Sequence, residues 1–194
     1  MQILHLRGHE IEKYWQEIGA LRIEVFREYP YLYEGSLEYE RDYLKAYWQS
    51  ENSLIVLLYD GDRAVGATTC MPLMEEHAEF WSPFREASLE PHEFFYLGES
   101  VLLPEYRGRG FGNFFFDERE AHARRLGGFG YTCFCAVERP PDHPLKPTDY
   151  RPLHGFWQRR GYQHRPDLRC QFSWQDLNES EASSKPLSFW LRPS

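Results

Sequence analysis

The chain has 194 residues, a length typical of a single domain, and we expect one domain over residues 1–194. Its 42% hydrophobic and 17% aromatic residues suffice for a packed core, which excludes disordered, collagen-like and coiled-coil proteins. The 30 Asp and Glu residues outnumber 22 Lys and Arg, for a net charge of −8. Proteins that bind nucleic acid or anionic membranes over their surface carry the opposite sign, so we expect neither partner.

Two further features of the sequence bear on location and metal content. No apolar run approaches the roughly 20 residues of a membrane helix, and no basic stretch precedes an apolar segment at the start, so we expect a cytoplasmic protein. The cysteines are too few and too scattered for a disulfide framework. Cys133 and Cys135 have no second pair at metal-ligand spacing, so we expect buried strand thiols and no metal site.

The first half of the chain predicts three strands and two helices. Helical spacing of apolar residues is halted by Pro30, and Ser36 is placed to cap the helix that follows. A turn at Gly61 joins two strands as a hairpin. In chain order the predicted elements are a strand at 2–7, a helix at 10–26, a helix at 38–48, a strand at 53–59 and a strand at 64–70.

The second half predicts a similar mixture, which makes the chain an α/β domain built on a mixed sheet. A helix over 74–88 is interrupted by Pro83, and the residues 138–149 contain four prolines and form a loop. The clearest helix has one apolar stripe, formed by Phe111, Phe114, Phe115, His122 and Leu126. The other predicted elements are a strand at 94–103, that helix at 110–126, a strand at 129–137, a helix at 150–160 and strands at 168–174 and 187–191.

The segment from Tyr96 to Asn113 joins a strand to a helix through a loop with three alternate glycines. Glycines let the main chain approach a ligand closely, and the first turn of the helix leaves N–H groups free at the positive end of its dipole. Arg107 and Arg109 add positive charge. The segment therefore predicts a phosphate-binding site.

Three phosphate-binding motifs can be tested on this loop. A P-loop requires a lysine after its last glycine, and none follows. The dinucleotide fingerprint requires a third glycine where Asn113 stands. The pattern [QR]-x-x-G-x-[GA] is matched by Arg107, Gly110 and Gly112.

With this pattern, residues 101–112, Val-Leu-Leu-Pro-Glu-Tyr-Arg-Gly-Arg-Gly-Phe-Gly, resemble the central motif of the GNAT superfamily of acyl-CoA-dependent N-acyltransferases. Residues 155–162, Gly-Phe-Trp-Gln-Arg-Arg-Gly-Tyr, resemble its later helix-to-strand motif, and the order of elements over most of the chain is similar. The resemblance implies a mixed sheet of about seven strands flanked by about four helices. It also implies acetyl-CoA as co-substrate, with its pyrophosphate on the glycine loop and its pantetheine arm beside the preceding strand. The residues that it places at the cofactor are Val101, Leu102, Leu103, Arg107, Gly108, Arg109, Gly110, Phe111, Gly112, Asn113 and Trp157.

The implied reaction is direct attack of a primary amine on acetyl-CoA, which requires a base because an alkylammonium with a pKa near ~10 is not a nucleophile. Glu99 lies two residues before the cofactor strand, where related enzymes often place such a carboxylate. An ordinary carboxylate at a strand end is the alternative. Ser100 could hold a water, although a simple strand serine is the better interpretation.

A general acid for the departing thiolate is not evident. Trp157 stands where the superfamily frequently has tyrosine, and an indole cannot serve as the acid. Tyr131, Tyr150 or Tyr162 could substitute, but each is better explained as a packing residue. Cys135 could carry an acyl group only if it were not a buried structural thiol.

For the acceptor, the resemblance points to the segment between the first two helices, with Tyr31 and Tyr33 as binding residues and Glu38, Tyr39 and Glu40 nearby. Tyrosines beside glutamates suit a cationic amine, and packing of the loop onto the core is an equally good interpretation.

Two hypotheses follow. The first is a cytoplasmic N-acetyltransferase that acts on an amine of a small molecule or protein; the second is a non-catalytic acyl-CoA sensor or partner-binding module on the same fold. A homodimer paired through the final strands is expected if an edge near 187–191 is exposed.

Overall fold

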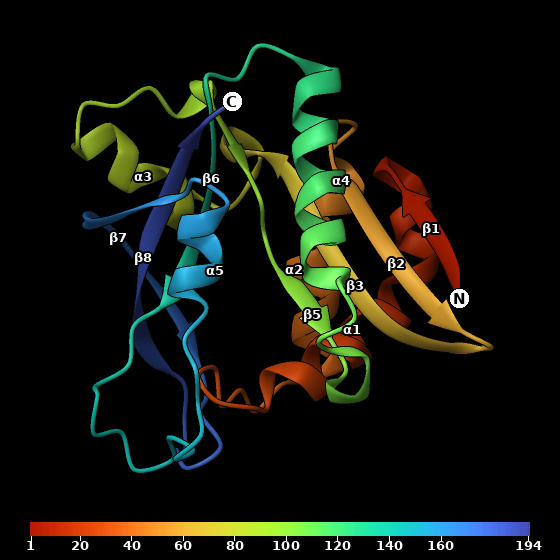
Figure 1. Cartoon of the computed structure of the whole chain (residues 1–194), viewed down its shortest axis with the longest axis vertical. Coiled ribbons are helices and arrows are strands. Elements are labelled where there is room, and N and C mark those ends of the chain that lie inside the picture. Colours follow the sequence, from red (N-terminus) through yellow and green to blue (C-terminus); the bar gives the residue numbers. More distant parts are fainter.

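The computed structural model describes all residues from Met1 to Ser194, arranged as five α-helices around a sheet of eight strands (Figure 1). The helices are α1 (Trp15–Phe26), α2 (Leu37–Gln49), α3 (Ala78–Glu86), α4 (Phe111–Leu126) and α5 (His154–Arg159). The strands are β1 (Gln2–Leu6), β2 (Leu54–Asp60), β3 (Arg63–Pro72), β4 (Phe94–Tyr96), β5 (Ser100–Leu102), β6 (Tyr131–Val137), β7 (Gln163–Trp174) and β8 (Ser183–Pro193).

The sheet has the strand order β1-β2-β3-β4-β6-β8-β7, and β5 pairs with β3 beyond the end of β4. Only β4 and β6 are parallel; every other pair is antiparallel. The prediction of an α/β domain with a mixed sheet is therefore confirmed. Figure 1 shows β1, β2, β3 and β5 on one side and β6, β8 and β7 on the other. In the strand order β4 lies between the two groups.

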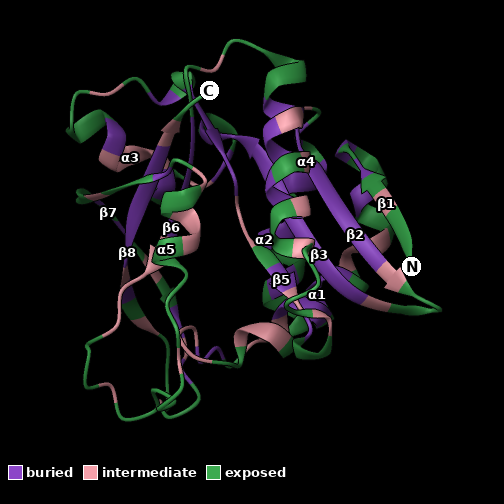
Figure 2. Cartoon of the chain, in the orientation of Figure 1, coloured by how far each residue is buried: buried purple, intermediate pink, exposed green.

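The aliphatic strand β2 is buried on both faces, as its sequence predicts. Ile55 and Leu57 pack in a core cluster with residues of α1 and α2, whereas Leu54 and Val56 pack in a second cluster with Phe116 of α4. Figure 2 shows β2 and β3 buried over most of their length. Helices on both faces of this half of the sheet thus hold β3 and β5 in place.

Helix boundaries agree with the sequence where a local signal exists. Ser36 caps α2 by accepting a hydrogen bond from the Tyr39 N–H at 3.2 Å. The helix expected over 10–26 is α-helical only from Trp15, because Gly8–Tyr14 form 3-10 turns. The interrupted helix expected over 74–88 shortens to α3 and contains Pro83.

Three expectations are wrong in detail. The strand expected over 94–103 is divided into β4 and β5: both pair with β3, but only β4 also pairs with β6, and the register against β3 shifts by one residue between Tyr96 and Ser100. The predicted stripe of α4 is incomplete, since Leu126 is exposed while Arg119 is buried. Residues 187–191 do not form an edge, because β8 lies between β6 and β7, so the argument for a dimer through that edge fails.

Candidate active site

The glycine loop leads into α4 with its main-chain donors free. The five consecutive N–H groups of residues 108–112 make no hydrogen bond within the protein. Gly108 and Gly110 have φ values of 74° and 91°, which only glycine adopts without strain, and no atom lies within 4 Å of where their Cβ would be. The N-terminus of a 16-residue helix with an open row of donors fits the pyrophosphate of coenzyme A.

Some of the polar side chains around this loop already have hydrogen-bond partners within the protein. Arg107 donates to the Leu102 carbonyl at 3.0 Å and to Glu28 Oε2 at 2.7 Å. Asn113 Oδ1 accepts from Arg160 at 3.1 Å. Arg109 is exposed with its guanidinium 5.2 Å from the centre of the Tyr106 ring, and no acidic partner holds it. Arg109 is therefore the cation of the loop that is free to meet an anionic ligand.

In the strand predicted to run beside the pantetheine, the main-chain groups of successive residues point in opposite directions. Leu103 donates to the Val65 carbonyl at 3.0 Å, and the Glu99 carbonyl accepts from the Thr69 N–H at 3.0 Å, so the odd-numbered residues of this stretch pair with β3. In an antiparallel ladder the intervening residues point their main-chain groups the other way. Ser100 and Leu102 therefore present their N–H groups toward β6, whereas Val101 and Leu103 pair with β3 through their main chains and bury their side chains in the core.

The sheet opens immediately before this stretch. The Leu97 N–H donates to the Cys133 carbonyl at 2.7 Å in the last main-chain hydrogen bond between the two halves of the sheet, and from Phe134 onward β6 pairs only with β8. A Cβ at Gly98 would overlap Thr69 Oγ1 and Tyr47 Oη, so glycine lets the main chain pass close to these two side chains. The opening, flanked by free N–H groups, fits the extended arm of coenzyme A.

Glu99 lies at this opening, with its side chain 11% exposed. It forms an ion pair with Arg22 of α1 and accepts from Tyr43 Oη at 3.2 Å. Arg22 also pairs with the buried Glu40 of α2, which accepts from Tyr33 Oη at 2.9 Å. Burial works to lower the pKa of Arg22, but Glu40 and Glu99 outweigh it and raise that pKa well above its usual value.

Glu99 and Arg22 line a pocket that encloses about 580 Å³ of empty space, part of it open to solvent. Nine of its fourteen lining residues are aromatic, among them Tyr31 and Tyr33, which the sequence assigned to the acceptor. Tyr39 also lines the pocket, while Glu38 is exposed outside it. The structure thus brings the expected base and the expected acceptor residues together.

The tyrosines considered as general acid, and Trp157 at the position where the superfamily frequently has tyrosine, lie outside the pocket. Trp157 packs against Phe134 and Trp190 with ring centres 5.0 and 5.1 Å away. Tyr162 donates to Glu120 at 3.1 Å, and Tyr150 packs against Tyr29. None of these residues lines the pocket, and neither does Tyr131.

Two residues that do line the pocket are Tyr96 and Cys135, whose Oη and Sγ atoms are 3.2 Å apart. Burial raises the pKa of the Cys135 thiol well above its usual value, which disfavours the thiolate that an acyl carrier needs. All four cysteines are free and buried, as expected of strand thiols. No group of three or more His, Cys, Asp and Glu side chains is placed to hold a metal ion.

Sequence reasoning missed several residues of this site. Arg22 lies within an apolar helix, where a single arginine resembles an ordinary surface residue, and Tyr43 and Tyr96 resemble core aromatics. One signal could have identified the pair of Arg22 and Glu40: an arginine among the apolar residues of one helix and an acidic residue in the helix that follows.

No helix of the structure is both long and apolar enough to cross a membrane.

Comparisons with known proteins agree with this geometry. The fold is similar to an acetyltransferase from Thermus thermophilus (14% identity, TM-score 0.58, covering 100% of this chain and 98% of the other). It is also similar to a ribosomal-protein-alanine N-acetyltransferase from Brucella melitensis (12%, 0.62, 100% of both). A third similar structure is yncA from Salmonella typhimurium with its cofactor acetyl-CoA (9%, 0.58, 98% and 93%).

At these identities the structures show a shared fold alone. No curated protein matches the sequence significantly. The family model described as "Acetyltransferase (GNAT) family" matches residues 16–162, a range that includes the glycine loop, Glu99 and most of the pocket. The chain belongs to the GNAT family of acetyltransferases.

Proposed function

We propose that the protein is an N-acetyltransferase that transfers an acetyl group from acetyl-CoA to the primary amine of an acceptor held in the aromatic pocket. The observation that carries this proposal is that one stretch of chain provides the free donors at 108–112, the N–H groups of Ser100 and Leu102 that do not pair with β3, and Glu99 in the pocket. Coenzyme A supplies the acetyl group as a thioester, whose carbonyl is open to attack by an amine.

The residues of the chain divide the remaining work. The N–H groups at 108–112 and the side chain of Arg109 bind the phosphates, and the N–H groups of Ser100 and Leu102 are placed to hold the arm and to stabilise negative charge on the thioester oxygen. Glu99 attracts the ammonium and accepts its proton, directly or through one water. The thiolate that departs has a pKa of about 8.5 and requires no dedicated acid.

Two observations favour the alternative of a non-catalytic acyl-CoA-binding module. Glu99 is held by Arg22 and Tyr43, so a structural role would account for its burial without catalysis. The absence of a tyrosine at Trp157 points the same way. Turnover separates the two functions, since only an enzyme releases free thiol in proportion to acceptor.

The first test is a thermal-shift titration with acetyl-CoA, coenzyme A, ATP and NAD. At 100 times the dissociation constant, binding adds about 2.7 kcal/mol of stability, which raises the midpoint of a protein of this size by roughly 5–10 °C. We expect a shift with the two CoA species alone, followed by thiol release when an amine is added. Absence of a shift with coenzyme A would overturn the proposed function, and a shift without thiol release from any amine would establish the binding module.

A further inference from the structure

The pocket beside Glu99 is lined mainly by aromatic rings, which suits a ligand that itself carries an aromatic ring. Its rings come from widely separated parts of the chain, including Phe26 of α1, Phe80 of α3, Phe172 of β7 and the loop residue Tyr31. Aromatic walls bind another ring through offset or edge contacts in addition to the burial of apolar surface.

The charged end of the pocket is anionic. Glu99 and Glu40 carry two negative charges and Arg22 one positive charge, which leaves one negative charge among the three buried side chains. Two of the nitrogens of Arg22 already donate to these carboxylates. A cation is therefore attracted to the Glu99 end of the pocket, and an anion is not.

That end is the only place where the pocket offers a charge. Among the fourteen lining residues, Glu99 is the single acid and Arg22 the single base. A second ammonium group on the acceptor would lie among rings with no carboxylate beside it. Burial of a charge without a partner is costly, so the lining favours an acceptor with one positive charge over a polyamine or a multiply charged amino sugar.

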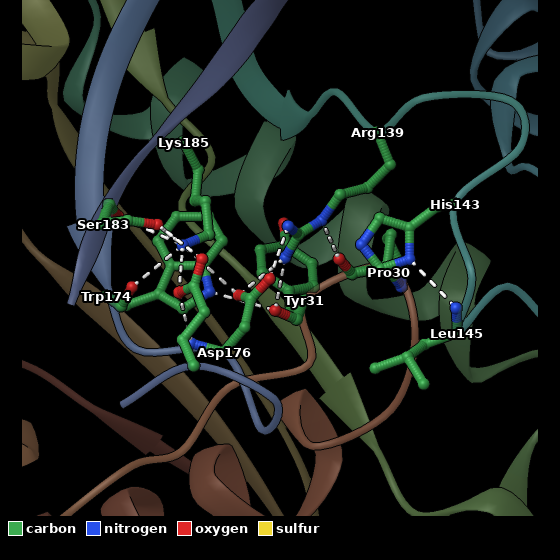
Figure 3. Close-up of polar contacts among 10 residues, drawn as sticks. Pro30, Tyr31, Arg139, His143, Leu145, Trp174, Asp176, Ser183 and Lys185 are labelled. Atoms are coloured by element: carbon green, nitrogen blue, oxygen red, sulfur yellow. Dashed lines mark hydrogen bonds and ion pairs between the residues drawn. The ribbon is translucent and has the colours of Figure 1, made fainter. Parts of the chain in front are cut away.

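One wall of the pocket, which contains Tyr31 and Trp174, is held together by polar contacts (Figure 3). Arg139 donates to the Pro30 and Tyr31 carbonyls, each at 2.7 Å, and forms a two-pronged ion pair with Asp176 at 2.7 and 2.9 Å. Lys185 donates to the Trp174 carbonyl at 3.1 Å and lies 3.6 Å from Asp176. Arg139, Asp176 and Lys185 are all nearly inaccessible to solvent, so the wall is pre-formed.

Main-chain groups on this wall are already paired with one another. The Glu34 N–H donates to the Gln175 carbonyl at 2.8 Å, and the Leu177 N–H donates to the Leu32 carbonyl at 2.7 Å. The Trp174 indole N–H donates to the Tyr31 carbonyl at 3.0 Å. An extended polypeptide needs free main-chain partners along its binding groove, and this wall offers it none at these positions.

From these features we infer that the acceptor is a small primary amine with a single positive charge, joined by a short chain to an aromatic ring. The inference rests on the proposed function, because it takes the pocket as the acceptor site. The ammonium lies at Glu99 beside the opening of the sheet, and the ring lies between the aromatic walls.

The test compares acceptors that differ in one property each. We would measure kcat/KM by thiol release for 2-phenylethylamine, propylamine, spermidine and a peptide with a free N-terminal alanine. The expected result is a kcat/KM for 2-phenylethylamine at least tenfold above that of each other acceptor. Equal or better turnover of spermidine or of the peptide would overturn the inference while leaving the proposed function intact.

A binding measurement keeps the inference testable if no amine is turned over. With coenzyme A present, calorimetry would compare 2-phenylethylamine with 2-phenylethanol and 3-phenylpropionate, which replace the ammonium by a neutral and an anionic group. We expect the amine to bind at least tenfold more tightly than either. Tighter binding of the alcohol or the acid would overturn the inference that the anionic Glu99 end of the pocket recognises the ammonium group.

A variant with a matched control tests the walls. Tyr39 lines the pocket and is 36% exposed, so Tyr39→Ser removes a ring without opening the core. We expect about a fivefold rise in KM for 2-phenylethylamine and an unchanged KM for acetyl-CoA. Tyr59→Ser, at the end of β2 and outside the pocket, should change neither value. An unchanged KM in Tyr39→Ser would count against the aromatic wall.

Discussion

Arg22 of α1 and Glu99 form a buried ion pair at the point where the two halves of the sheet separate. The Arg22 guanidinium lies 4.1 Å from the centre of the Tyr43 ring and 5.1 Å from that of Phe26, and it also holds Glu40. One cation thus neutralises part of the charge of two buried carboxylates and fixes the position of Glu99 in the pocket.

Arg22→Met should destabilise the protein strongly, because it leaves Glu40 and Glu99 buried without a cation. Loss of one partner of a buried ion pair costs about 3–5 kcal/mol, which corresponds to a fall in Tm of roughly 10 °C for a chain of this length. Thermal unfolding at pH 7.5 measures the change. Arg27→Met breaks the exposed pair with Glu34 and is the control, expected to shift Tm by about 1–2 °C. Equal shifts in the two variants would contradict the role given to Arg22.

Glu99→Gln should reduce kcat by about 100-fold or more, because the amide keeps the shape of the side chain but cannot accept the proton. Binding of acetyl-CoA, measured by calorimetry, should be unchanged. The matched control is Glu40→Gln, since Glu40 binds the same Arg22 but does not line the pocket. We expect this control to retain kcat within a few-fold. If the two variants lost kcat equally, Glu99 would be a support of the fold and not the base.

The parts of this structure that the sequence predicts are those with local causes. The glycine loop, the start of α4 and the Ser36 cap depend on neighbouring residues, so their positions were foreseen correctly. Glu99 and the tyrosines at 31 and 33 were assigned to the site from a resemblance, and the structure brings them to one pocket.

The parts that could not be predicted depend on contacts between distant residues. Arg22 and Glu99 are 77 positions apart, and nothing near either residue indicates the other. The break between β4 and β5 is the point where the chain loses its pairing with β6 while it keeps β3 as a neighbour, which no pattern within the strand reveals. The ion pair of Arg139 with Asp176 likewise forms only when the turn between β7 and β8 meets the loop after β6.

Two glycines of the phosphate loop should respond differently to alanine. Gly110 has a φ of 91°, so Gly110→Ala forces a left-handed conformation that costs about 1–2 kcal/mol and disturbs the row of free N–H groups. Gly112 lies within α4, where a Cβ meets nothing closer than Phe156 at 3.7 Å. We expect Gly110→Ala to lower Tm and to weaken binding of coenzyme A at least tenfold, and Gly112→Ala to preserve both. Calorimetry checks the affinities, and equal affinity in both variants would rule out the loop geometry as the cause of binding.

Glu76 should make stability depend on pH. Burial raises the pKa of its carboxyl to about 7, and Glu76 Oε2 has no hydrogen-bond partner in the structure. The folded protein therefore keeps this proton at pH values where the unfolded chain, with its pKa near 4.5, has lost it. The sign follows from this difference: the contribution of Glu76 to stability is full below pH 4.5 and is lost as the pH rises to about 7.

Glu76→Gln replaces the carboxyl by a neutral amide and removes this loss. We expect the variant to be more stable than the parent at pH 8, by an amount on the order of 3 kcal/mol, and similar to it at pH 4.5. Thermal unfolding at a series of pH values gives the difference in Tm between the two proteins. Glu79→Gln, three residues along on the exposed side of α3, should follow the parent at every pH. A Tm difference for Glu76→Gln that stayed constant from pH 4.5 to pH 8 would show that the buried carboxyl does not titrate in this range.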